Sequence, residues 1–105
     1  MLYGGFFSMK LVNLLQLMQD VDSNYQIYFH EDTHPNNYPI SKIIFSQNKC
    51  ILTSLSINPR TIYQLLTICR QIKHKNVNVY FAINNHEYSI FGMQIQPDKK
   101  QIILK

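Results

Sequence analysis

An internal repeat is the feature of this sequence that most constrains its fold, because the two copies together cover most of the chain. Residues 11–54 and 62–105 each begin with apolar residues at helical spacing and continue with short alternating stretches. Self-similarity at a fixed period is typical of a duplicated structural unit. We therefore expect one domain, residues 1–105, made of a leader (residues 1–8) and two copies of one unit (residues 9–55 and 58–105). The matching segments are residues 11–21 and 62–72, 27–29 and 79–81, 38–40 and 88–90, and 51–52 and 102–103.

Each copy is predicted to be a helix followed by three strands. Apolar residues at positions 11, 14, 15, 18 and 21 form one helical stripe, which positions 62, 65, 66, 69 and 72 repeat. Asn58 and Pro59 are favoured residues for the cap and the first position of the second helix. Gly92 interrupts a strand and suggests a bulge. The first helix is expected over residues 8–21, and the strands over residues 25–30, 40–46, 50–55, 77–83, 88–96 and 101–104.

The predicted fold class is α+β with antiparallel sheets. The connections between strands are compatible with hairpins, and neither helix joins two strands of a βαβ unit through short loops alone. We favour one six-stranded sheet that carries both helices on one face, and two packed layers are the alternative.

The composition limits the possible partners. Charged residues make up 15% of the chain, below the usual quarter, and the net charge is +4 with scattered Lys and Arg. Such a charge is compatible with nucleic acid without indicating it. The apolar runs are far shorter than the ~20 residues that span a membrane, and the first residues lack a secretory pattern, so we expect a cytoplasmic protein. Cys50 and Cys69 have no metal-type spacing and are expected to be inert, buried thiols.

Few residues are available for catalysis. Residues 30–34 match the zinc motif H-E-x-x-H, but they follow a strand and run into Pro35, whereas that motif requires a helix. A weaker hypothesis is that His30, His34 and His86, with Glu31 and Asp32, hold an ion where two hairpin loops meet. Solvated loop side chains are the alternative. The chain has no Gly-rich phosphate loop, nucleophile elbow or CxxC pair. We therefore predict no catalytic residue, no cofactor and no enzymatic activity.

Equivalent tyrosines are the strongest candidates for binding. Tyr28 and Tyr80 occupy matching places on the strand face opposite the apolar stripe, and Tyr38 and Tyr88 also match. A sheet face with Tyr28, Ile44, Tyr80 and Ala82 would be too apolar to be fully solvated and too polar to be a main core. Such a face suits a protein partner or a second copy, because Tyr is enriched at interfaces. It also suits the stacking of unpaired bases, and coverage by the protein's own loops and leader is the third interpretation.

Residues 9–53 carry a further pattern, Met-x-Leu-x-x-Leu-Leu-x-x-Leu, then a strand, a polar loop, Pro-Ile and a closing pair of strands. This pattern resembles a class of short uncharacterised proteins from phages, prophages and Gram-positive bacteria. The second copy departs from it at Ser89, where the first has Pro39. The class has no assigned chemistry, so the resemblance implies no activity. The matching residues are Met9, Leu11, Leu14, Leu15, Met18, Ile27, Pro39, Ile40, Ile43, Ile51 and Leu52.

The sequence thus predicts a small protein that acts by binding. Association with a second copy or another protein is the first expectation, and weak binding of single-stranded nucleic acid is the second. Basic residues interleaved with aromatics on one face would favour the second, and this signal is thin in the sequence.

Overall fold

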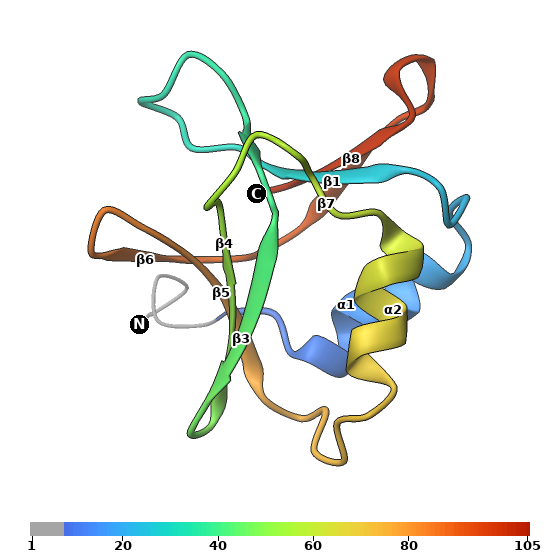
Figure 1. Cartoon of the computed structure of the whole chain (residues 1–105), viewed down its shortest axis with the longest axis vertical. Coiled ribbons are helices and arrows are strands. Elements are labelled where there is room, and N and C mark those ends of the chain that lie inside the picture. The colour runs from blue at the N-terminus through green and yellow to red at the C-terminus, as the bar shows by residue number, and fades with distance from the viewer. Residues whose placement is uncertain (1–7) are drawn as a thin grey trace.

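The computed structural model describes residues 8–105, in which two helices pack against two four-stranded sheets (Figure 1). An α+β fold is therefore confirmed. Except for Ser8, the predicted leader lies outside the described residues. The helices are α1 (Leu11–Gln19) and α2 (Ile62–Cys69). The strands are β1 (Gln26–Phe29), β2 (Tyr38–Pro39), β3 (Lys42–Ser46), β4 (Lys49–Thr53), β5 (Asn78–Ile83), β6 (His86–Ser89), β7 (Met93–Gln96) and β8 (Gln101–Leu104), and the 3-10 turn η2 (Pro97–Lys99) joins the last two.

Each sheet contains strands from both halves of the chain. Sheet A has the order β3-β4-β5-β6, and sheet B has the order β2-β1-β8-β7. The central pairs, β4 with β5 and β1 with β8, are parallel, whereas the outer pairs are antiparallel. The prediction of antiparallel sheets, with a single six-stranded sheet favoured, is therefore wrong.

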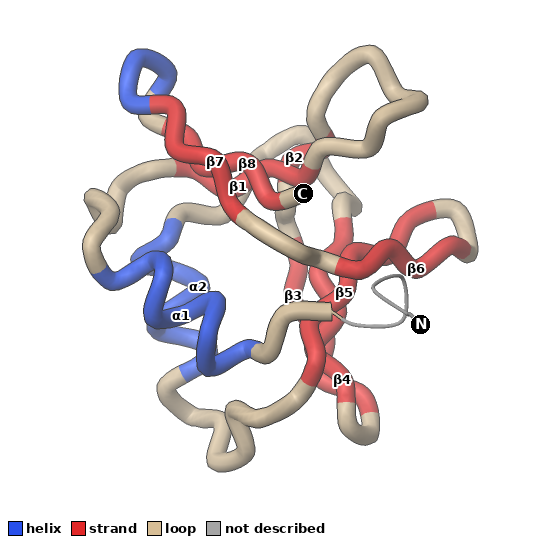
Figure 2. The backbone as a smooth tube through the Cα atoms, turned by 180° about the vertical axis from the view of Figure 1, so that it is seen from behind, coloured by secondary structure: helices blue, strands red, loops and turns tan. Residues whose placement is uncertain are grey.

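The reason for the error lies in the connections of α2. Residues 54–61 lead from β4 into α2, and residues 70–77 lead from α2 into β5. These connections are long enough to return the chain to the start of the sheet, so β4, α2 and β5 form a parallel crossover unit. Figure 2 shows from behind that both helices lie side by side on one side of the two sheets.

The pairings of one half repeat those of the other. Exchanging each of β1–β4 with the strand four places later turns the order of sheet B, β2-β1-β8-β7, into β6-β5-β4-β3. This is the order of sheet A read from its other end. Tyr28 pairs with Ile103 as Tyr80 pairs with Ile51, so Ile51 corresponds to Ile103. The sequence match of residues 51–52 with 102–103 is thus displaced by one residue, which exchanges the two faces of a strand. The duplication itself, as two superposable copies, stays a prediction.

The chain passes directly from one sheet to the other at two places. The amide of Ile40 donates to the Ile27 carbonyl of sheet B at 3.0 Å, whereas the next amide, Ser41, donates to Thr53 of sheet A at 3.0 Å. The second passage separates β6 from β7 at residues 90–92. The predicted continuous strand over residues 88–96 with a bulge at Gly92 is therefore wrong, because the chain changes sheets there.

Helix α2 begins later than predicted. Thr61 is its N-cap: the side chains of Thr61 and Gln64 each accept a hydrogen bond from the other's backbone amide. The predicted cap at Asn58 is wrong because the Arg60 amide donates to Ile40 at 2.7 Å and its carbonyl accepts from Ile27 at 3.0 Å. These bonds hold the chain extended up to the cap.

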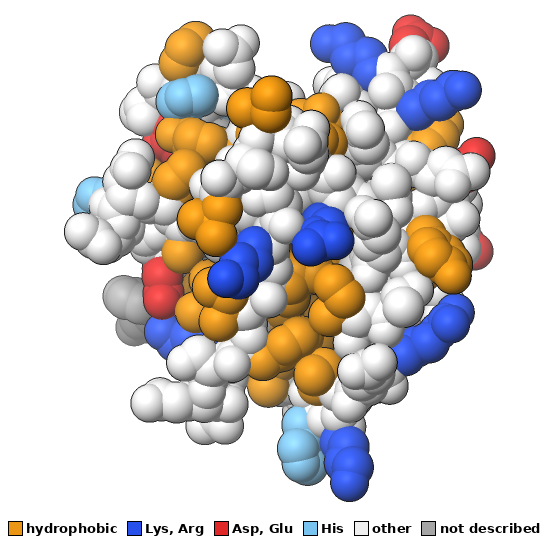
Figure 3. Space-filling view, viewed as in Figure 1, with side chains coloured by type: hydrophobic (Ala, Val, Ile, Leu, Met, Phe, Trp, Pro, Cys, Tyr) orange, Lys and Arg blue, Asp and Glu red, His pale blue; other side chains and the backbone are white. Residues whose placement is uncertain are grey.

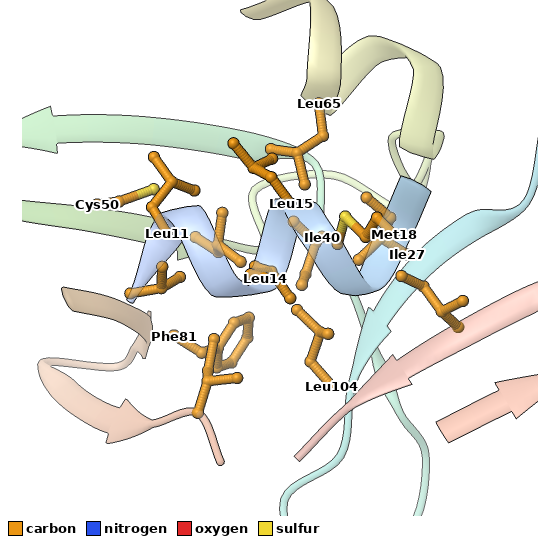
Figure 4. Packing of buried hydrophobic residues seen from close by; sticks show 14 of the residues in the cluster. Leu11, Leu14, Leu15, Met18, Ile27, Ile40, Cys50, Leu65, Phe81 and Leu104 are labelled. Carbon is orange, nitrogen blue, oxygen red and sulfur yellow. The ribbon is translucent and has the colours of Figure 1, made fainter. Parts of the chain in front are cut away.

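The hydrophobic core lies where both helices and both sheets meet (Figure 4). The predicted helical stripes are confirmed in part, since α1 buries four apolar residues and α2 buries three. Phe29 of sheet B stacks on Phe81 of sheet A with ring centroids 4.3 Å apart and an interplanar angle of 14°. Such aromatic pairs add about 0.5–1.5 kcal/mol beyond their buried area. The fully buried side chains include Leu11, Leu14, Met18, Ile27, Ile40, Leu52, Ile62, Leu65, Phe81, Ile90 and Ile102.

Candidate functional site: a polar groove on sheet B

The two candidate tyrosines lie on different sheets. Tyr28 is in β1 and points away from the core on the outer face of sheet B, whereas Tyr80 is in β5 on the outer face of sheet A. Ile44 is in the same row of sheet A as Tyr80, with Ile51 between them. The predicted single face that contains all of these residues is therefore wrong, because the equivalent strands of the two halves belong to separate sheets.

Tyr38 and Tyr88 pack inward. The ring centroids of Tyr38 and Phe81 are 5.4 Å apart, and those of the equivalent Tyr88 and Phe29 are 5.8 Å apart. Both tyrosines are half-buried against the core. Each ring therefore contacts the phenylalanine of the opposite sheet, which makes these two residues part of the packing between the sheets.

A groove of about 510 Å³ lies on the outer face of sheet B. Tyr28, Ile103 and Gln94 are neighbours in one row across its strands, and Gln101 and Gln96 form the next row. Ile103 is only 2% exposed and belongs to the floor. The complete lining consists of Tyr28, His30, Pro35, Asn36, Asn37, Gln94, Gln96, Lys99, Gln101, Ile103 and Lys105.

The loop between β1 and β2 forms one wall of the groove. The two ring nitrogens of His30 lie 3.0 Å from Asn37 Oδ1 and 3.1 Å from Asp32 Oδ1, so this side chain joins the two ends of the loop. His34 stacks on Tyr38 with ring centroids 4.2 Å apart. These contacts give the wall a defined shape.

The charges of the groove favour an anionic ligand. Lys99 precedes β8 and Lys105 follows it, so the two lysines lie on either side of a four-residue strand that is roughly 13 Å long. Among the described residues, no carboxylate side chain lines the groove. Asp32 contacts His30 from the solvent side, and Asp98 is next to Lys99 in η2. The lining itself therefore combines two lysines and five amide side chains with the Tyr28 ring, the His30 imidazole, Pro35 and Ile103.

The three histidines of the metal hypothesis are divided between the two sheets. His30 and His34 belong to the loop of sheet B, whereas His86 is in β6 of sheet A, with its ring 6.3 Å from Tyr88. Within residues 8–105, no three His, Cys, Asp or Glu side chains are grouped so that they could hold a metal ion. In this arrangement His30 and His34 organise the wall of the groove.

The outer face of sheet A differs from that of sheet B. Ile44 is 38% exposed and occupies the place that Gln94 has in sheet B. Lys49 and Glu87 form an ion pair at 3.0 Å, and Lys49 Nζ lies 5.2 Å from the centre of the Tyr80 ring. Sheet A therefore presents an apolar row with charges of both signs beside it.

The sequence pointed to Tyr28, and to His30 only as a possible metal ligand, whereas the other lining residues were not predicted. The available signal was the alternation of Gln94 and Gln96 with apolar neighbours, which places two amides on one strand face. Lys99 and Lys105 could not be assigned to that face without the pairing of β1 with β8.

Comparison with known protein families, curated proteins and solved structures finds no match. In the described part of the chain, no helix has the length and apolar character that crossing a membrane requires.

Proposed function

We propose that this protein acts by binding, without catalysis, and that the groove on sheet B holds single-stranded nucleic acid. The observation that carries the proposal is the half-buried ring of Tyr28 between Lys99 and Lys105, in a lining that holds no carboxylate side chain among residues 8–105. Single-strand binders combine aromatic stacking surfaces with basic grooves. Two cations at the ends of one groove suit a ligand with more than one negative charge.

In this proposal each group has a distinct role. Tyr28 stacks on a base, and the lysines neutralise phosphates. The amide side chains of Gln94, Gln96 and Gln101 offer both donors and acceptors to base edges. Binding of this kind depends strongly on salt and only modestly on sequence.

Fluorescence anisotropy with labelled single-stranded oligonucleotides tests this function. Tyr28→Ala should weaken binding by roughly 5- to 150-fold, because one stacked base contributes about 1–3 kcal/mol. Replacing both Lys99 and Lys105 by Gln should reduce the dependence of affinity on salt. Tyr80→Ala, the equivalent change on sheet A, is the matched control and should bind like the wild type. An equal loss in both tyrosine variants, or no binding by the wild type at low salt, would refute the proposal.

A second proposed function is self-association, which the apolar row Ile44, Ile51 and Tyr80 on sheet A favours. A symmetric dimer buries one patch against its own copy, and a row flanked by charges of both signs is suited to that. In sedimentation experiments Ile44→Ser should shift the protein toward monomer, whereas Gln94→Ser, the equivalent change on sheet B, should not. A wild-type protein that is monomeric at tens of micromolar would exclude this second function.

A further inference from the structure

We propose that two copies of the protein associate through β3, which pairs antiparallel with β3 of the second copy and joins the two A sheets into one. This inference rests on the proposed self-association and specifies its surface. An edge strand presents a row of unpaired backbone amides and carbonyls, which is a template for pairing with another chain.

Of the four edge strands, β3 is the least protected against pairing. In residues 8–105 it has a neighbour on only one side, β4. Its central residues, Ile43, Ile44 and Phe45, include no charge, proline or glycine. Figure 3 shows apolar side chains gathered between β3 and α2 on this side of the molecule.

The other three edges carry features that discourage pairing. Strand β2 has only two residues, one of which is Pro39. Strand β6 begins with His86 and Glu87, which are both exposed. Strand β7 has four residues and is followed directly by Pro97, the first residue of η2. Strand β3 has five residues and is therefore also longer than each of the other edges.

The sequence of β3 suits pairing with itself. If the two-fold axis passes beside Ile44, this residue faces Ile44 of the second copy, and Lys42, the only charged residue of the strand, faces Ser46. Like charges directly opposite each other are thereby avoided. The half-buried side chains of Ile43 and Phe45 face each other across the axis and gain cover from the second copy.

This register also extends the outer apolar row. Each copy contributes Ile44, Ile51 and Tyr80 in line across sheet A. Pairing through β3 places the two Ile44 residues side by side, so the row continues across the dimer. Ile44 therefore belongs both to the outer apolar row and to the strand that pairs.

Disulfide cross-linking measures this register directly. Opposite residues of an antiparallel pair have Cβ atoms about 4.5–5.5 Å apart, close to the separation in a disulfide. Ile44→Cys alone should form a covalent dimer under mild oxidation. Lys42→Cys and Ser46→Cys should cross-link only when the two variants are mixed. The native thiols, Cys50 and Cys69, are buried and free, so they do not compete.

A charge placed at the two-fold axis should disrupt the same β3 interface. Ile44→Lys brings two lysines together and should weaken dimerisation about tenfold or more. Ile95→Lys is the control, because Ile95 is 46% exposed on the edge strand of the other sheet. Circular dichroism should confirm that both variants fold.

The outcomes separate this inference from the function on which it rests. Register-specific cross-linking together with dissociation of Ile44→Lys supports pairing through β3. If the wild type is a dimer but Ile95→Cys cross-links as well as Ile44→Cys, or Ile44→Lys still dimerises, the β3 interface is overturned. Self-association through another surface then remains. A wild type that is monomeric at tens of micromolar overturns both.

Discussion

At the scale of single residues, the alternation of polar and apolar residues predicted which side chains of β1 point inward. It could not do so for β4 and β8. Ile27 and Phe29 are buried as expected, because polar neighbours leave one apolar face. In β4 and β8 several successive residues are apolar, so either face was possible. The register of the parallel pairs decides that Leu52 and Leu104 point inward. That register depends on contacts between distant segments and cannot be predicted from a short stretch of sequence.

The two buried thiols should make stability depend on pH. Burial raises the pKa of Cys50 from its ordinary 9.0 to about 12 and that of Cys69 to about 11. Above pH 9 the unfolded chain therefore releases thiol protons that the folded protein retains, so the free energy of unfolding falls as the pH rises toward 12. A variant with both cysteines changed to Ala should lose melting temperature less steeply over this range. Parallel slopes in the wild type and the variant would contradict the burial of these thiols.

At the scale of elements, the amphipathic helices were predictable, whereas the start of α2 was not. Asn58 and Pro59 form a strong local start signal, yet tertiary hydrogen bonds keep this segment extended. The capping-box pattern of Thr61 and Gln64 was present in the sequence as a competing signal. The parallel pairing of β4 and β5 was missed for a similar reason, because periodicity defines a strand without defining its neighbour.

Removing the cap of α2 should measure which signal the protein uses. Thr61→Ala should lower the free energy of unfolding by about 1 kcal/mol, the usual cost of a lost N-cap. Thr67→Ala is a matched control on the same helix, since the Thr67 hydroxyl donates to the carbonyl of Tyr63 and caps nothing. Urea denaturation of both variants, with Asn58→Ala beside them, gives the comparison. If Asn58→Ala costs as much as Thr61→Ala, the helix begins where the local signal predicted.

At the scale of the whole molecule, the repeat predicted equivalent elements but not the exchange of strands between the halves. Each sheet joins β1 and β2, or β5 and β6, of one half to the last two strands of the other half. The Phe29–Phe81 stack then joins the two sheets across the core. Two independent half-domains would have fitted the same sequence pattern, so the connection between the halves had to come from the structure.

This exchange predicts how the protein responds to division. The connection after β4 contains the exposed residues Leu55 and Ile57, so the chain can be divided after Ile57 with little loss of packing. Each fragment alone, residues 1–57 or 58–105, lacks the parallel partner of its central strands, β1 and β4 or β5 and β8. We expect neither fragment to form a folded monomer. Mixing equal amounts should restore the circular dichroism spectrum and a cooperative melt, with sedimentation showing one copy of each fragment per particle. A fragment that melts cooperatively as a monomer would mean that one half forms both of its sheets without the other.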